Sequence, residues 1–181
     1  MVPGMTTITA AWSLIFSLFW TVAGAVVYPP PAMIERYFFV ESGVTHVFEV
    51  WQPFAADFHL LVERSEIGNG IRAVRRVPPV FRLFRRNIDD TPAFELIVGV
   101  IKATSLGPRR RVFVFRPQGA QIKPVWLSSR LSYVLQDFTM SDTDRTSLLH
   151  TRETRYGEVW RGTYIWDTFG FRPIAMKEEV Q

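Results

Sequence analysis

Two short acidic segments are the first candidates for chemistry in this chain of 181 residues. The sequence reads NIDDT at residues 87–91 and DTDRT at residues 142–146, so both follow the pattern Asn or Asp, any residue, Asp, any residue, Thr. Oxygen-bearing side chains that alternate in this way can bind calcium when about six to eight oxygens converge on a curled loop. The candidate metal ligands are Asn87, Asp89, Thr91, Asp142, Asp144 and Thr146.

The same segments can also be read as plain turns. Asp and Thr side chains hydrogen-bond to their own backbone in turns, which explains the pattern without a metal. Arg145 stands within the second segment, where its charge opposes a cation. We therefore expect repeated turns without a cofactor, with bound calcium as the alternative.

The sequence contains no motif that points to catalysis. Its three histidines, His46, His59 and His150, do not have the short spacing of zinc ligands, and there is no cysteine. Phosphate loops, dinucleotide fingerprints and the G-x-S-x-G elbow are also missing from the sequence. We predict a non-catalytic protein, with an extracytoplasmic hydrolase that uses His59 or His150 as an alternative.

Arginine is concentrated in two clusters and accounts for most of the positive charge, which gives a net charge of +4. The first cluster comprises Arg72, Arg75, Arg76, Arg82, Arg85 and Arg86, and the second comprises Arg109, Arg110 and Arg111. Such clusters can bind anionic lipid headgroups or an acidic protein partner. The alternative is a solvated strand face whose arginine stems cover apolar surface. We expect no nucleic acid partner, because the N-terminus predicts a membrane anchor.

The N-terminal segment has no Asp, Glu, Lys or Arg before Glu35. Residues 8–27 form an apolar run of the length that a membrane-spanning helix needs, which is about 20 residues. Small residues recur at every fourth position and would let a partner transmembrane helix approach closely: Thr9, Ser13, Ser17, Thr21 and Ala25. We predict a single-pass anchor over residues 1–28, followed by a Pro-rich linker over 29–35.

A signal peptide is the alternative for this segment. The sequence Ala23-Gly24-Ala25 fits the small-x-small cleavage pattern, and cleavage there would release a secreted protein. Against cleavage, the segment has no basic residue at its start, and its apolar run is long for a signal peptide.

We predict a β-rich domain over residues 36–176 and a C-terminal tail over residues 177–181. Short runs of β-branched and aromatic residues alternate with turn residues. We predict strands over 37–40, 45–51, 58–62, 80–84, 95–102, 111–115, 123–127, 147–151, 163–166 and 171–175. A helix is plausible only over 128–136. The run ELIVGVIK at 95–102 has no polar alternation, so we expect it to be buried on both faces.

The order of these strands repeats. An acidic loop, a buried strand, a basic connection, an aromatic strand, a Gly turn and a last strand occur over 87–127 and again over 142–175. The runs FHLLVER and VFRLF would form a third, degraded copy. Repeats of about 40–50 residues with four strands are typical of propeller blades.

Residues 87–172 resemble β-propeller repeats of the FG-GAP/VCBS type, in which a D-x-D-G-D-G loop precedes a buried strand and an aromatic strand follows. The resemblance implies a propeller-like, extracytoplasmic domain that serves adhesion or recognition, and many family members bind calcium in the loop. Here the third Asp is Thr in both loops, and the loop glycines are replaced by Asp90 and Pro92 and by Arg145 and Ser147.

Two or three blade-like units are fewer than the four that usually close a propeller, so we expect a partner to cover the open faces. Together these features predict a membrane-anchored extracytoplasmic binding or scaffold protein. We expect it to be an accessory subunit of a membrane protein complex.

Overall fold

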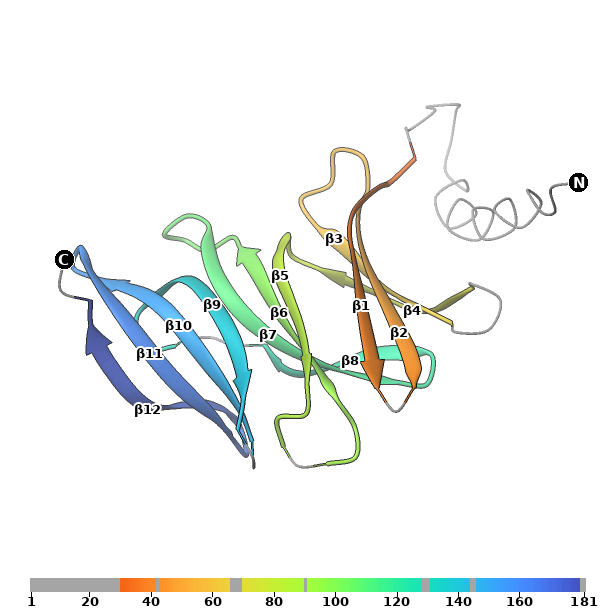
Figure 1. The fold of residues 1–181 in the computed structure, drawn as a ribbon. Coiled ribbons are helices and arrows are strands. Elements are labelled where there is room, and N and C mark those ends of the chain that lie inside the picture. Colours follow the sequence, from red (N-terminus) through yellow and green to blue (C-terminus); the bar gives the residue numbers. More distant parts are fainter. Residues whose placement is uncertain are drawn as a thin grey trace, which may run out of the picture.

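The fold is described from a computed structural model, for residues 30–41, 43–65, 70–89, 91–127, 131–143 and 146–179. Twelve strands and no helix occur in these residues. The strands form three antiparallel sheets of four strands, and neighbours along the chain are neighbours in each sheet (Figure 1).

The first sheet contains β1 (Ala32–Glu41), β2 (Val44–Gln52), β3 (His59–Arg64) and β4 (Ile71–Val77). The second sheet contains β5 (Val80–Arg86), β6 (Glu95–Lys102), β7 (Arg109–Gln118) and β8 (Gln121–Leu127). The third sheet contains β9 (Val134–Asp142), β10 (Ser147–Arg155), β11 (Glu158–Asp167) and β12 (Gly170–Glu178).

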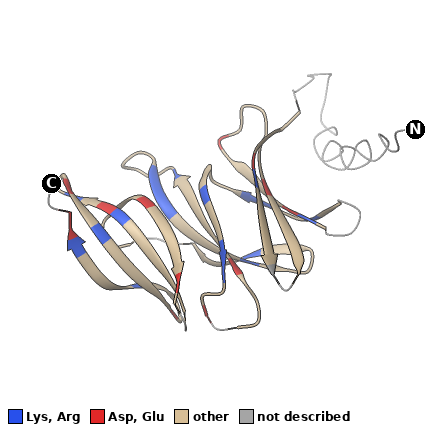
Figure 2. Ribbon diagram, viewed as in Figure 1, with Lys and Arg blue, Asp and Glu red and all other residues tan. Residues whose placement is uncertain are grey.

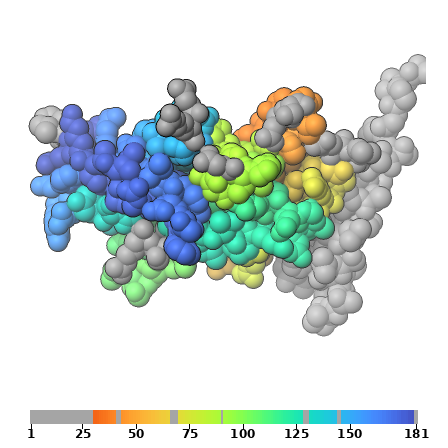
Figure 3. Space-filling model, turned by 90° about the horizontal axis from the view of Figure 1, so that it is seen from below, coloured from red at the N-terminus to blue at the C-terminus, as the bar shows by residue number. Residues whose placement is uncertain are grey.

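The three sheets pack face to face in chain order, and the second sheet lies in the middle (Figure 1). Figure 3 shows the same succession from below, from the third sheet in blue to the first in orange. Phe48 of the first sheet packs with Leu96 of the second in one core, while Ile97 packs with Leu149 of the third in another. The first six residues of β6 are buried, which confirms the expectation for ELIVGVIK.

All three sheets carry two β-bulges at matching places. In the first, second and third sheets, the extra residue of the first strand is Ile34, Phe81 and Gln136, respectively. The extra residue of the fourth strand is Arg72, Val125 and Ile174, in the same order. The third strand pairs with the second, and this register puts Leu61, Val112 and Arg161 of the three third strands level with the first bulge. The second bulge follows two residues later, at Glu63, Val114 or Thr163. Because bulges are specific structural features, the sheets are three copies of one unit.

The structure confirms the ten predicted strands with shifted ends, and it corrects two other predictions. The helix over 128–136 is wrong in its described part, because β9 begins at Val134. Leu135, Phe138 and Met140 all face the second sheet, and the bulge at Gln136 hides their strand periodicity. The assignment of FHLLVER and VFRLF to one degraded repeat is also wrong. The run VFRLF belongs to β5 in the second sheet, and β3 pairs with β2 and β4.

The predicted anchor at residues 8–27 lies outside the described part of the chain. Within the described part, no helix is long and apolar enough to cross a membrane.

Candidate functional site

A cleft of about 810 Å³ opens where the second and third sheets meet. Its walls come from the connection between β6 and β7, from the connection between β8 and β9, and from the hairpin between β10 and β11. These connections and the two acidic loops lie at opposite ends of the strands (Figure 1). The residues that line the cleft include Arg109, Arg110, Arg111, Tyr133, Arg155 and Tyr156.

The cleft is strongly basic. Four arginines and no Asp or Glu are among its described lining residues. Neither Arg109 nor Arg111 forms an ion pair with another described residue. Figure 2 shows arginine or lysine at the start of β7, and Arg109, Arg110 and Arg111 of this strand are among the lining residues. Like charges gathered on one concave surface focus a positive potential and favour an anionic ligand.

The other two arginines are held by aromatic rings. The Arg110 guanidinium lies 4.8 Å from the centroid of Phe81 and donates a hydrogen bond to the carbonyl of Gln136. The Arg155 guanidinium lies 5.0 Å from the ring of Tyr133 and 5.2 Å from that of Tyr156. It also donates to the Tyr133 hydroxyl at 3.1 Å. These contacts orient the guanidinium groups without neutralising them.

Tyr156 stands out at the rim of the cleft. It has a φ of 51° and is followed by Gly157 at 89°, the pattern of a type I′ hairpin turn. Asn, Asp or Gly usually occupies such a position, and a bulky residue there costs roughly 1–3 kcal/mol. The ring is 91% exposed, so it recovers little of this cost by burial. This geometry makes Tyr156 a candidate binding residue.

Below the cleft, Glu153 is fully buried and fixes the wall. It accepts hydrogen bonds from the Thr151 and Tyr164 hydroxyls, both at 2.6 Å, and from the backbone N–H of Tyr133. Burial and the bond to Glu153 raise the pKa of Tyr164 well above its ordinary value, so its hydroxyl remains a donor. The backbone N–H of Tyr133 is thus fixed against the buried Glu153.

An arginine of β7 contacts the first acidic loop and supplies a positive charge there. The Arg116 guanidinium lies 2.5 Å from Asp89 and 2.5 Å from Glu95. Asp89 also accepts bonds from the hydroxyl and the N–H of Thr91, as expected for a turn. Burial would raise the pKa of Asp89, but the bonds from Thr91 and Arg116 outweigh it and lower the pKa. Burial dominates at Glu95 and raises its pKa.

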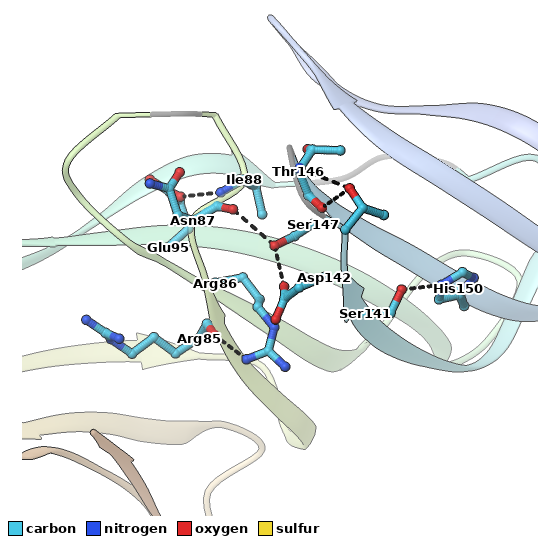
Figure 4. Close-up of polar contacts among 11 residues, drawn as sticks. Arg85, Arg86, Asn87, Ile88, Glu95, Ser141, Asp142, Thr146, Ser147 and His150 are labelled. Carbon is cyan, nitrogen blue, oxygen red and sulfur yellow. Dashed lines mark hydrogen bonds and ion pairs between the residues drawn. The ribbon is translucent and has the colours of Figure 1, made fainter. Parts of the chain in front are cut away.

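The structure brings the two acidic loops together, as Figure 4 shows. The Ser147 hydroxyl lies 3.1 Å from the carbonyl of Asn87 and 2.7 Å from Asp142. Asp142 also lies 3.1 Å from Arg86 of the second sheet. The N–H of Thr146 donates to the Thr143 hydroxyl in a closed turn. Asp90, Asp144 and Arg145 lie outside the described residues.

No group of three or more His, Asp or Glu side chains that could hold a metal occurs among the described residues. Asp89 and Asp142, the two described acidic side chains of the loops, each contact an arginine. These loops therefore act as salt-bridged turns that join neighbouring strands and sheets.

The first arginine cluster is spread over several environments. Arg75 and Arg85 stack on Phe115 and Phe94 within the structure, at 5.6 and 3.4 Å from the ring centroids. Arg82 and Arg86 link the second sheet to Asp137 and Asp142 of the third. The remaining two, Arg72 and Arg76, contact Glu63 of the first sheet and Phe58, which precedes β3. Only the second cluster, Arg109 to Arg111, gathers in one cleft.

The histidines have separate structural surroundings. His46 packs edge-to-face against Phe94, and His59 accepts a hydrogen bond from the N–H of Val80 at 2.9 Å. Burial lowers the pKa of His59, in keeping with a neutral acceptor ring. His150 lies 2.7 Å from the Ser141 hydroxyl, and its other ring nitrogen lies 3.3 Å from the Thr163 hydroxyl. In a serine hydrolase a carboxylate would hold the second ring nitrogen of the histidine, and here the Thr163 hydroxyl occupies that place.

The comparisons with protein families, curated proteins and solved structures give no match. The geometry of the chain itself therefore carries the functional argument. Sequence reasoning found Arg109, Arg110 and Arg111 but missed Tyr133, Arg155 and Tyr156. The available signal was the dipeptide Tyr156-Gly157 between two strands, which is a hairpin turn with an unusual aromatic residue at its first position.

Proposed function

We propose that this chain is a non-catalytic binding protein of a membrane complex. In this proposal, residues 8–27 anchor the chain, and the three-sheet domain lies outside the cytoplasm. The basic cleft holds an acidic segment of a partner protein. The chain then acts as an accessory or scaffold subunit, because binding alone accounts for the groups that the cleft offers.

The arginine-lined cleft is the observation that carries this proposal. Arg109 and Arg111 form no ion pair within the described chain, and four arginines with no Asp or Glu are among the described residues that line the cleft, which favours an anionic ligand. Tyr156 and Leu106, which are 91% and 78% exposed, add apolar area at the rim. Arginine and tyrosine are enriched among the residues that dominate protein interfaces. The mixture favours a protein segment with carboxylates and apolar side chains.

The domain is propeller-like in this proposal. Three four-stranded meanders with matching bulges, packed face to face, are the arrangement expected of successive blades. The cleft between two such units, lined by their connecting loops, is a common kind of place for a ligand. An open stack also leaves two outward faces for other subunits.

A test uses the full chain purified in mild detergent from its native membranes, with the bound proteins quantified by mass spectrometry. The double variant Arg109→Glu and Arg111→Glu should retain at least about tenfold less bound partner protein than the wild type. The reason is that charge pairs at interfaces contribute over about 1.4 kcal/mol. The control is Arg152→Glu with Arg172→Glu, which makes the same charge change on exposed residues of the third sheet. Equal retention by both variants would reject the cleft as the binding site.

The same preparation tests the anchor. Ser13→Leu with Ser17→Leu should loosen the complex and leave the domain folded, because larger side chains keep helices apart. N-terminal sequencing decides the alternative: a chain that starts at Val26 would be secreted and would contradict the anchor.

A further inference from the structure

On the outward face of the first sheet, the edge strands β1 and β4 expose apolar side chains, whereas Glu49 and Val62 of the two central strands are buried. Tyr37 and Phe39 point into the first core, so the alternating residues Phe38 and Val40 point outward. Their exposed fractions are 63% and 72%. Val74, which is 45% exposed, points outward on β4 because its neighbour Ala73 lies in the core.

The outward face of the third sheet differs, although the two ends of the stack are built from the same unit. The shared register places His150 and Thr163 where the second sheet has Ile97 and Val114. Those two residues of the second sheet are buried against its neighbour. The third sheet therefore ends the stack with a polar face, as terminal repeats do. The apolar face of the first sheet calls for a different explanation.

Arginines lie among the apolar side chains of this face. Arg36 and Arg64 lie 2.6 and 2.8 Å from the buried Glu49, so the trio keeps a net positive charge. Burial would raise the pKa of Glu49, but bonds from Arg64, Trp51 and Arg36 hold it below its ordinary value. The carboxylate therefore stays charged.

Arg76 adds a further positive charge on β4, where the register places it level with Met33 of β1. Its side chain is 69% exposed, and its guanidinium lies 3.9 Å from the ring centroid of Phe58. The opposing charge within reach is Asp57, which is 95% exposed and 3.9 Å away. Exposed apolar and aromatic side chains with arginines beside them are typical of a surface that rests on an anionic bilayer.

The position of the face in the chain specifies its occupant. Four residues separate Val27, the end of the apolar segment, from Ala32, the start of β1, and the five Cα-to-Cα steps span at most about 18 Å. The face therefore begins within that distance of the predicted anchor. A second copy is disfavoured, because the other end of the stack also carries arginines, Arg152 and Arg161, and like charges repel.

We propose that the outward face of the first sheet, around Phe38, Val40 and Arg76, lies on an anionic lipid bilayer next to the anchor. This inference rests on the anchor of the proposed function. Docking would hold the stack in one orientation on the membrane, with the sheets succeeding one another away from it. The basic cleft, which lies between the second and third sheets, would then remain free for its partner.

The test exploits the lack of cysteine in the chain. The full chain is placed in nanodiscs that contain phosphatidylcholine with phosphatidylglycerol. A nitroxide is attached to a single cysteine introduced by Val40→Cys, or by Thr139→Cys on the exposed polar face of the third sheet. Oxygen collides with nitroxides in the bilayer, and a water-soluble nickel chelate collides with those in water. The label at position 40 should favour oxygen, and the control label at position 139 should favour nickel.

Charge dependence provides the matched comparison. The substitution Arg76→Glu, or the replacement of phosphatidylglycerol by phosphatidylcholine, should lower the ratio of docked to undocked chains by roughly fivefold or more. The control Arg152→Glu should leave the ratio unchanged, since that residue lies on the other end of the stack.

The outcomes separate this proposal from the anchor. Release of the chain by alkaline carbonate would contradict the anchor and, with it, the docked face. Retention of the chain with a nickel-accessible label at position 40 would overturn the docked face and leave the anchor standing. A ratio of docked to undocked chains that changes neither with Arg76→Glu nor with lipid charge would overturn the requirement for anionic lipid.

Discussion

At the scale of single residues, Arg116 brings a positive charge to the first acidic loop. It contacts Asp89 and the fully buried Glu95 at 2.5 Å each. The substitution Arg116→Ala would leave Glu95 buried without its cation. We expect a loss of about 3 kcal/mol in the free energy of unfolding, measured by urea denaturation of the full chain in detergent.

Arg172→Ala is the control for this experiment. Its partner Asp167 and Arg172 itself are both more than half exposed, and such pairs contribute about 0–1 kcal/mol. Calcium should leave the wild-type urea midpoint unchanged. A higher midpoint in calcium would show that the loop binds the ion in spite of Arg116.

The sequence predicted one half of this arrangement. The spacing of Asp89 and Thr91 indicated a turn, and the bonds between the two residues have that form. Arg116 lies 27 residues away, and it reaches Asp89 only because β6 pairs with β7 next to Glu95. Tyr133 and Arg155 of the cleft meet for the same kind of reason. Such contacts depend on strand pairing, which local sequence patterns do not specify.

At the scale of elements, β-branched and aromatic runs predicted ten strands, and the two that were missed have clear causes. The strand β4 alternates apolar residues with arginines, so its residues were assigned to a charged cluster. The bulge in β9 breaks the period of two that identifies a strand. A stronger signal was present in the repeated motifs IKPV and FRPI, where Pro124 and Pro173 precede matching bulges on edge strands.

The strand β6 shows how tightly the second and third sheets pack. A Cβ atom on Gly99 would lie 2.7 Å from the rings of both Phe81 and Phe138. Both rings belong to the core between these sheets. The substitution Gly99→Ala should therefore destabilise the chain by about 1–3 kcal/mol, measured from the urea midpoint and slope.

Gly70→Ala controls for the change of residue type, because nothing lies within 4 Å of its added Cβ. It should leave the urea midpoint almost unchanged. Equal effects of the two substitutions would mean that the sheets pack more loosely than the structure shows.

At the scale of the whole molecule, the repeated order of loops and strands predicted two or three units, and three are present. The sequence could not show how the stack ends, because this depends on which face of each strand meets a neighbour. The register resolves this point. Residues that are apolar on the facing side of the second sheet, such as Ile97 and Val112, correspond to His150 and Arg161 on the third. The third sheet thus ends the stack by polar substitution within the same architecture.

This interpretation predicts that the polar end can be made adhesive. The double variant His150→Ile with Arg161→Val restores the side chains of the second sheet at matching positions. Because such a face is normally buried against another sheet, copies should associate through it, and light scattering after gel filtration in detergent should show chains per micelle rising at least about twofold. The variant Gln118→Ile with Lys123→Val makes a similar change at exposed sites of the second sheet and should not associate. If both variants kept the wild-type chain number, the polar residues would not be what ends the stack, and the strands at its edges would become the next place to look.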